Sequence, residues 1–462
     1  MKSVKGFMSG LLCAALTAGM LTGCGGPEVE TGSSAGENGR VESETGSGTK
    51  SESQAGEDGT ENTGDSTENS GAGQEGGGDQ KDTSAGEEGT IEIPEVVIEP
   101  FDIPEGEALQ FVHDMKIGWN LGNTFDATND SFTGDELELE SSWCGIKTTA
   151  EMIQDIKEAG FHSLRLPVSW HNHVDEDWQI SEAWLNRVQE VVDYAYDNGM
   201  YVILNIHHDN NEEFLYPDSA HLEQSVSYVT TIWEQLCSRF QDYDEHLIFE
   251  CMNEPRLVGS QYEWWLNPSA EECKDAVSCI NEINQAFVNT VRESGGNNGN
   301  RYLMVPGYCA SPDGVLNSGF VLPEDAEGVE NRLILSVHAY TPYNFALQGE
   351  GESGSTAEFD SDAAGSVRDI NSFMDQLYKK YVSNGIPVVI GEFGSRDKGG
   401  NLQSRVDHAA YYIAAARARG ITCVWWDNNA FSGNGENFGI YYRRQGKFLY
   451  PDILNALMKY AD

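Results

Sequence analysis

Basic residues are scarce in this sequence. Among 462 residues, 28 Lys and Arg stand against 75 Asp and Glu, and the formal net charge is -47. Such an excess of negative charge repels nucleic-acid phosphates and anionic lipid headgroups. We therefore expect no nucleic-acid partner and no membrane binding through a basic patch. A neutral substrate, such as a polysaccharide, meets no such repulsion.

Motifs of several common enzyme classes are also missing. No glycine-rich phosphate loop is present, and no GxSxG elbow joins a predicted strand to a predicted helix, which disfavours nucleotide chemistry and a serine nucleophile. The metal-ligand spacings HExxH and CxxC are absent as well. His207 and His208 are neighbours on one predicted strand, so we expect them to point to opposite faces and at most one of them to point inward. We therefore predict that the protein uses no metal and no other cofactor. The nine cysteines are irregularly spaced and do not indicate a disulfide scaffold.

The apolar run near the N-terminus is too short for a stable membrane span. Lys2 and Lys5 precede a mostly apolar segment at 7–21, which is typical of an export signal over residues 1–23. Leu21-Thr22-Gly23-Cys24 then resembles the bacterial lipobox. We expect acylation of Cys24 and an extracellular, cell-surface lipoprotein of a bacterium that touches the membrane only through this lipid anchor. The alternative is an ordinary signal peptide that happens to contain a cysteine.

Residues 24–90 lack the side chains that build a core. From Gly25 to Thr90 there is no aromatic residue, no leucine and no isoleucine, and Gly, Ser, Thr, Glu and Asp dominate. Such a composition cannot offset the entropy lost on ordering the chain. We expect a disordered, self-repelling acidic tether that holds a catalytic body away from the membrane. Residues 91–104 are apolar again and are compatible with a strand against that body, although their prolines weaken this prediction.

From residue 115 onward, short apolar segments alternate with amphipathic helical patterns. Eight segments are typical of buried parallel strands with polar or aromatic tips: Met115–Asn123, Ser163–Trp170, Met200–His208, Leu247–Pro255, Tyr302–Tyr308, Leu333–Tyr340, Pro387–Phe393 and Ile421–Asp427. The first helix begins at the capping box 148–151 and ends at Gly160, whereas the helix after the fifth strand is poorly marked. We predict a (β/α)8 TIM barrel in the domain 91–462, with an open doubly wound sheet as the alternative.

Two of the predicted strands carry a glutamate where the apolar run ends. Asn253 and Glu254 follow the fourth run, and Glu392 follows the seventh. Ligand chemistry in α/β folds lies at the carboxyl ends of strands, where two glutamates can act as a general acid and a nucleophile. One such glutamate alone could merely cap a turn, but two tips with an Asn-Glu pair favour catalysis. Trp425 and Trp426 would supply a stacking surface for a sugar ring, with one of the two packed in the core.

Seven segments together resemble glycoside hydrolase family five. They are Gly118–Thr124, Leu164–Val168, Asn205–His208, Phe249–Pro255, His338–Tyr340, Ile390–Gly394 and Trp425–Asn428. The first motif and Ser142-Trp143 are most similar to the family's bacterial endoglucanase subfamily four. The resemblance covers residues 111–462, and it departs from the subfamily at 143–145, where Trp-Cys-Gly stands in place of Trp-Gly-Asn.

The resemblance implies a retaining endo-β-1,4-glucanase (cellulase) that hydrolyses internal bonds of plant cell-wall glucans by double displacement. Glu254 matches the acid/base and Glu392 the nucleophile. Positions that bind substrate or orient the glutamates in the family match Asn123, Asp126, Arg165, His207, His208, Asn253, His338, Tyr340 and Trp426. In the family, Arg165 and Tyr340 would hydrogen-bond Glu392.

Other substrates and another class of protein remain open. The main activity could lie on xyloglucan, mixed-linkage glucan, mannan or xylan, because the loops that read a single hydroxyl cannot be folded from the sequence. A non-catalytic glycan-binding lipoprotein is the alternative from a different class, and it would be marked by loss of a glutamate, yet both are present. We expect the protein to be a monomer.

Overall fold

The computed structural model describes residues 90–433 and 435–462, and eight parallel strands in this part of the chain close into a barrel in sequence order. The strands are β1 (Ile117–Leu121), β2 (Ser163–Leu166), β3 (Tyr201–Asn205), β4 (Leu247–Glu250), β5 (Leu303–Pro306), β6 (Leu333–His338), β7 (Val388–Phe393) and β8 (Thr422–Asp427). Because β8 pairs with β1, the barrel has no edge strand. The predicted (β/α)8 barrel is confirmed, and the open sheet is excluded.

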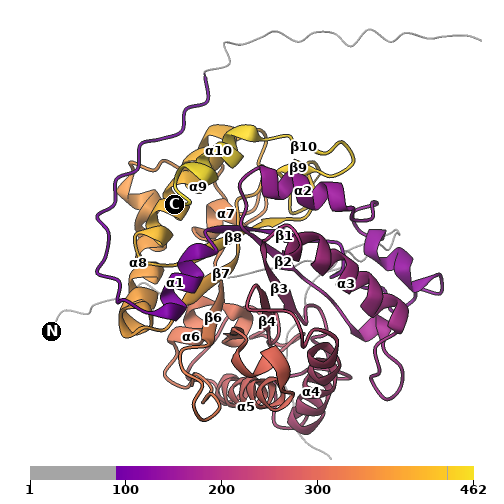
Figure 1. Ribbon diagram of the computed structural model, residues 1–462. Coiled ribbons are helices and arrows are strands. Elements are labelled where there is room, and N and C mark those ends of the chain that lie inside the picture. The colour runs from indigo at the N-terminus through magenta and orange to yellow at the C-terminus, as the bar shows by residue number, and fades with distance from the viewer. Residues whose placement is uncertain (1–89, 434) are drawn as a thin grey trace, which may run out of the picture. The chain divides into compact units, whose positions relative to one another are not determined.

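The helices surround the barrel, as Figure 1 shows. The longer ones are α2 (Ala150–Glu158), α3 (Glu182–Tyr196), α4 (Leu222–Arg239), α5 (Glu271–Glu293), α8 (Ala364–Lys380), α9 (Leu402–Arg417) and α10 (Pro451–Lys459). Each agrees with its predicted helix to within a few residues. The α2 cap is Thr149 rather than Thr148, since the Thr149 hydroxyl accepts the Met152 N–H at 3.4 Å.

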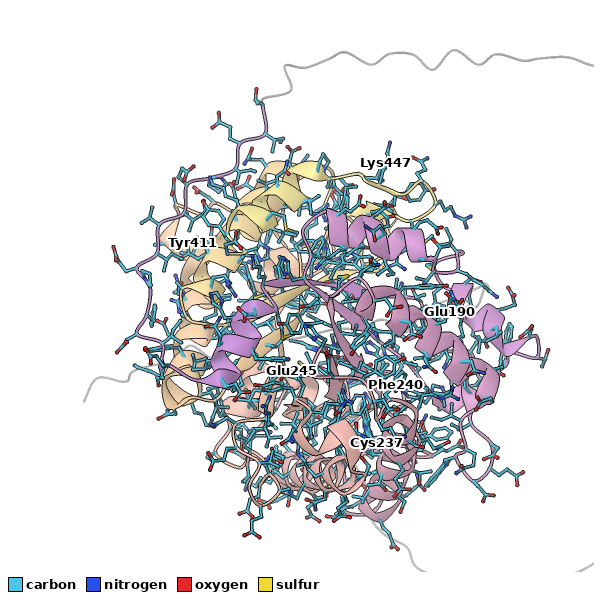
Figure 2. The ribbon with its side chains drawn as sticks, in the orientation of Figure 1. Glu190, Cys237, Phe240, Glu245, Tyr411 and Lys447 are labelled. Atoms are coloured by element: carbon cyan, nitrogen blue, oxygen red, sulfur yellow. The ribbon has the colours of Figure 1, made fainter. Side chains whose placement is uncertain are left out.

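The region after β5 was poorly marked because its helix is very short. The helix α6 (Pro312–Leu316) has five residues, too few to show an amphipathic period. The helix α7 (Tyr343–Ala346) and the two-stranded sheet of β9 (Tyr441–Tyr442) and β10 (Lys447–Phe448) are equally short and were not predicted. Figure 2 labels Cys237 of α4, which is fully buried, and Lys447 of β10 near the edge of the molecule in this view.

A further helix, α1 (Glu107–Asp114), closes the N-terminal end of the barrel and was not predicted. Its buried residues and Met115 pack against side chains of the strands, among them Ile203 and Ile248. The Phe111 ring stacks on Tyr302 with 3.7 Å between centroids. Since α1 fills this end, the open end of the barrel is at the C-terminal tips of the strands.

The expected strand at 91–104 is wrong. This segment has no regular secondary structure and bonds to side chains of the last helices instead. The Gln403 side chain accepts the backbone N–H of Glu92 at 3.0 Å and donates to its carbonyl at 2.7 Å. The Tyr460 hydroxyl accepts the Val96 N–H at 2.8 Å. Three prolines remove ladder donors from the segment, which explains why it lies along α8 to α10 as a single strap (Figure 1).

Several predictions fall on the N-terminal part of the chain. The export signal at 1–23, the acylated Cys24 and the tether at 24–90 lie outside the described residues, except for Thr90. Within the described part, no helix is both long and apolar enough to cross a membrane. Cys251 and Cys423 are both buried free thiols.

Candidate active site

The two predicted catalytic glutamates meet at the C-terminal end of the barrel. Glu392 lies within β7, whereas Asn253 and Glu254 lie three and four residues beyond the end of β4. A carboxylate oxygen of Glu254 and one of Glu392 are within 4.8 Å of each other. This distance suits a nucleophile facing an acid/base and is shorter than the roughly 6.5–9.5 Å that would admit a water between them.

His338, at the end of β6, lies between the two carboxylates. Its Nδ1 is 2.9 Å from Glu254 Oε1 and 3.7 Å from Glu392 Oε1. Burial raises the pKa of Glu254, but the bond and charge of His338, with the charges of Arg256 and His208, bring this pKa below its usual value. His338 therefore orients the Glu254 carboxylate and favours its anionic form in the free site.

Arg165, in β2, is fully buried and binds Glu392. Its Nη1 donates to Glu392 Oε1 at 2.8 Å, and its Nη2 donates to Asn253 Oδ1 at 2.8 Å. The Tyr340 hydroxyl donates to the other oxygen, Glu392 Oε2, at 2.8 Å. Both oxygens of Glu392 thus accept a hydrogen bond, which fixes the carboxylate and stabilises its charge. The two expected partners of Glu392 are confirmed.

Glu250 is a member of the site to which the sequence patterns gave no role. Its side chain is fully buried and accepts hydrogen bonds from Arg165 Nε at 2.8 Å, from Asn205 Nδ2 at 3.0 Å and from the Ser336 hydroxyl. Asn120, in β1, also accepts from Arg165 Nη1 at 3.0 Å. The sequence could have indicated this role, because a charged residue such as Glu250 inside an apolar strand needs hydrogen-bonding or charged partners when it is buried.

Of the two tryptophans at the end of β8, Trp425 packs in the core, as was expected of one of them. Trp425 is fully buried, and its indole N–H donates to the Phe438 carbonyl at 3.2 Å. Trp426 keeps 6% of its surface exposed and lies parallel to the His207 ring, with 5.9 Å between centroids. Trp143 is 44% exposed, and its ring centroid is 5.8 Å from that of His208. Rings of this kind offer flat apolar surfaces on which the face of a sugar can pack.

One prediction on this side of the site is corrected. Strand alternation was expected to point His207 and His208 to opposite faces, but β3 ends at Asn205, and both rings place a nitrogen within 4.8 Å of an Asp126 oxygen. Asp126 is itself fully buried and accepts the backbone N–H of Asn123 at 3.0 Å. Its carboxylate therefore shapes the loop of Asn123, and its expected contact with a sugar stays a prediction. Burial raises the pKa of Asp126 to about 6.

Two groups of described residues have the chemistry of metal ligands: Asp126, His207 and His208, and Glu254, His338 and Glu392. Most of their polar atoms are already engaged in hydrogen bonds. Asp126 accepts backbone N–H groups, His338 Nδ1 faces Glu254, and His207 Nδ1 faces the side-chain amide of Asn205 at 3.1 Å. Both groups are explained as hydrogen-bonding sets, and the absence of a metal requirement stays a prediction.

Comparison with known proteins gives consistent matches. Residues 125–432 match the model of the cellulase family, glycosyl hydrolase family 5. Endoglucanase B of Ruminococcus albus is 45% identical over 358 residues, which are 77% of this chain and 81% of that protein. The cellulase/esterase CelE of Acetivibrio thermocellus is 42% identical over 357 residues, 77% of this chain, but the chain spans only 40% of its length.

Solved structures agree. A family 5 lichenase from Caldicellulosiruptor sp. F32 is 60% identical with a TM-score of 0.79, and the match covers 80% of this chain and 100% of that one. A GH5-4 broad specificity endoglucanase from Ruminococcus champanellensis with bound cellotriose is 43% identical with a TM-score of 0.70, covering 78% and 100% of the two chains. The chain therefore belongs to glycosyl hydrolase family 5, and it is a glycoside hydrolase of the endoglucanase or lichenase type that acts on β-glucans.

Proposed function

We propose that this protein is an endo-β-1,4-glucanase that cleaves internal bonds of plant cell-wall glucans and retains the configuration of the anomeric carbon. The observation that carries the proposal is the separation of less than 4.8 Å between oxygens of Glu254 and Glu392. At that separation one carboxylate can attack the anomeric carbon while the other protonates the leaving oxygen.

The reaction proceeds in two displacements. In the first, the protonated form of Glu254 gives its proton to the glycosidic oxygen, the Glu392 carboxylate attacks the anomeric carbon, and the bond to the leaving chain breaks. In the second, Glu254 takes a proton from water, the water oxygen attacks the same carbon, and the ester bond to Glu392 breaks. Arg165 and Tyr340 hold Glu392 in place for both steps.

Asn253 is placed to bind the sugar under attack. Its Oδ1 is occupied by Arg165 at 2.8 Å, so its amide N–H groups are left to donate to a hydroxyl of the ring that reacts with Glu392. Trp426 supplies the apolar floor for the same ring. A ring held on both sides has its anomeric carbon near the nucleophile, which is the main contribution that positioning makes to the rate.

Mixed-linkage β-glucan is a second candidate for the preferred substrate. The 60% identity of this chain to a family 5 lichenase supports this candidate. A 43% identical relative is described as a broad specificity endoglucanase with bound cellotriose, which favours acceptance of several β-1,4-glucans. Mannan and xylan have no such support. A non-catalytic glycan-binding role is disfavoured because both glutamates and their partners are in place.

The substrate test is an activity panel. Reducing ends released from carboxymethylcellulose, mixed-linkage glucan, xyloglucan, mannan and xylan should show the highest rates on the first two. Products from mixed-linkage glucan, identified by mass and linkage, should arise from cleavage of β-1,4 bonds. Activity confined to mannan or xylan would contradict the proposal.

The stereochemical test uses proton NMR of the first-formed sugar, which should be the β-anomer. Glu392→Ala should form no glycosyl-enzyme. Glu254→Ala should still form one from substrates with activated leaving groups, and azide should speed its breakdown. An α-product, or azide rescue with the two roles exchanged, would contradict the assignment.

A separate proposal concerns location. The lipobox residues before Cys24 support an acylated N-terminus that anchors the enzyme at the surface of a bacterial cell. Cys24→Ser should release the protein from membranes into the medium. Cys13→Ser, in the same leader, is the matched control and should leave the protein anchored. A Cys24→Ser protein that stays on the membrane would refute the anchor.

A further inference from the structure

The side chain of Asn205, at the end of β3, has its orientation fixed by two neighbours. Its Oδ1 accepts the backbone N–H of Val168 at 3.1 Å, and its Nδ2 donates to the buried Glu250 Oε2 at 3.0 Å. A backbone N–H can only donate, and an ionised carboxylate can only accept. The amide therefore cannot be turned over without breaking both bonds.

The remaining hydrogen of the same Nδ2 faces the ring of His207. The distance from Asn205 Nδ2 to His207 Nδ1 is 3.1 Å. Because the amide nitrogen donates, Nδ1 must accept, so the neutral ring carries its proton on Nε2. Burial, together with the positive charge of Arg165, keeps the pKa of His207 well below its usual 6.5, so the ring stays neutral.

The His207 ring borders the surface on which the sugar is proposed to lie. It is parallel to Trp426 within 2°, with 5.9 Å between centroids. We propose that Asn205 is a positioning residue that selects the Nε2–H tautomer of His207 and so makes His207 a permanent hydrogen-bond donor to a hydroxyl oxygen of the sugar on Trp426. The sugar contact rests on the proposed function, whereas the tautomer does not.

A donor of fixed direction has a consequence for the substrate. A hydroxyl group can donate or accept, and a histidine free to change its tautomer could match either choice. When the ring can only donate, the hydroxyl must accept, and its own hydrogen is left for another acceptor. Glu250 accepts a hydrogen bond from Asn205, and Asn205 donates to His207 Nδ1. The buried carboxylate thus decides, through Asn205, that His207 donates to the sugar.

The tautomer can be observed without substrate. In the full-length enzyme labelled with ¹⁵N-histidine, two-bond nitrogen–proton spectra distinguish a protonated Nε2 from a protonated Nδ1. We expect His207, assigned from the signals lost in His207→Gln, to show a protonated Nε2 and a bare Nδ1 from pH 5 to pH 8. Wild-type enzyme with the opposite tautomer, or with a doubly protonated ring in this range, would overturn the proposal, and this measurement needs no variant of Asn205 to fold.

Asn205→Asp tests the cause. A carboxylate at this position can only accept, so His207 should move its proton to Nδ1 or hold two protons. His408 is an internal control, because its ring is buried elsewhere and its Nε2 lies 2.9 Å from the Thr341 carbonyl. Its signals should not change. An unchanged His207 in folded Asn205→Asp enzyme would show that Asn205 does not select the tautomer.

Kinetics then test the role toward the sugar. Asn205→Asp should lower kcat/KM on a soluble β-glucan by about 10- to 100-fold, as expected for one lost hydrogen bond in a buried site. Asn284→Asp is the matched control, since Asn284 is buried outside the site, where it donates to the Pro306 carbonyl at 2.9 Å, and activity should persist. A switched tautomer with full activity would overturn the donor role. The expected tautomer with no β-glucan hydrolysis by the wild type would instead refute the proposed function and leave the tautomer assignment standing.

Discussion

Arg165→Met tests the buried ion network beneath the nucleophile. The change removes a guanidinium that donates to Glu250, Glu392, Asn120 and Asn253 at 2.8 to 3.0 Å and replaces it with an apolar chain of similar length. Two carboxylates with little or no exposure then lose their cation. Breaking a buried ion pair in this way costs about 3–5 kcal/mol of unfolding free energy.

The expected cost can be expressed as a melting temperature. About 370 described residues at about 2.1 cal/mol/K each give an unfolding entropy near 0.8 kcal/mol/K, so the midpoint should fall by about 4–6 °C. Tryptophan fluorescence during thermal unfolding measures this shift. Hydrolysis of a soluble glucan should also fall by several orders of magnitude, because Glu392 and Asn253 lose the group that orients them.

A second substitution shows whether the penalty comes from unpaired charge. In Arg165→Met with Glu250→Gln, one of the two stranded carboxylates becomes neutral, so the double variant should be more stable than Arg165→Met by about 1–3 kcal/mol. If Glu250→Gln lowers the stability further, the network reasoning is wrong. Arg292→Met is a control outside the site, where Arg292 pairs with Asp325 at 2.6 Å. It should cost stability but leave kcat unchanged.

Three further perturbations follow from the same geometry. Folding raises the pKa of Asp126 from 3.8 to about 6, so the folded state holds this proton more tightly, and the stabilisation is present below about pH 4 and is lost as the pH rises through 6. Urea unfolding should therefore show the stability of wild type relative to Asp126→Asn falling by about 2.4 kcal/mol between pH 4 and pH 7. A constant difference would contradict this. Tyr340→Phe removes a 2.8 Å donor to Glu392 and should lower kcat/KM by about 10- to 150-fold with little change in melting temperature, whereas an unchanged kcat/KM would argue against the contact. Prolonged chelation should leave the rate on a soluble glucan intact, and a loss restored by zinc or calcium would count against metal independence.

The barrel was readable from the sequence because parallel strands buried on both faces leave continuous apolar runs. Each run ended in polar or aromatic residues, and each longer helix carried an amphipathic period. The parts that were missed have neither signal. The strap at 91–104 is held by the side chains of Gln403 and Tyr460, which lie more than 300 residues away in sequence. The helix α1 has only eight residues and is specified by the barrel end that it covers.

Within the site, the residues that touch Glu392 could be expected from motifs, but the directions of other side chains could not. Neighbouring side chains in a strand point to opposite faces, and this rule applied to Trp425 and Trp426, which lie inside β8. It failed for His207 and His208, which lie beyond the end of β3. Asp126 lies at a position matching the family's sugar-binding residues, yet two backbone N–H groups turn its carboxylate into its own loop. The orientation of a side chain outside a strand is set by its hydrogen-bond partners, and these partners can lie far away in sequence.

The arrangement around Arg165 explains why the site contains a third carboxylate. An arginine paired with Glu392 alone would neutralise the nucleophile and hold both of its oxygens in a bidentate bond. Here the Nε of Arg165 donates to Glu250, and its Nη1 donates to one oxygen of Glu392. The Tyr340 hydroxyl donates to the other oxygen of Glu392. The single positive charge is therefore shared between two carboxylates, and the pair Glu250 and Glu392 with Arg165 keeps a net negative charge beside the anomeric carbon. Glu250 thus leaves Glu392 fixed in position but only partly neutralised, which is what an attack on a carbon that becomes positively charged requires.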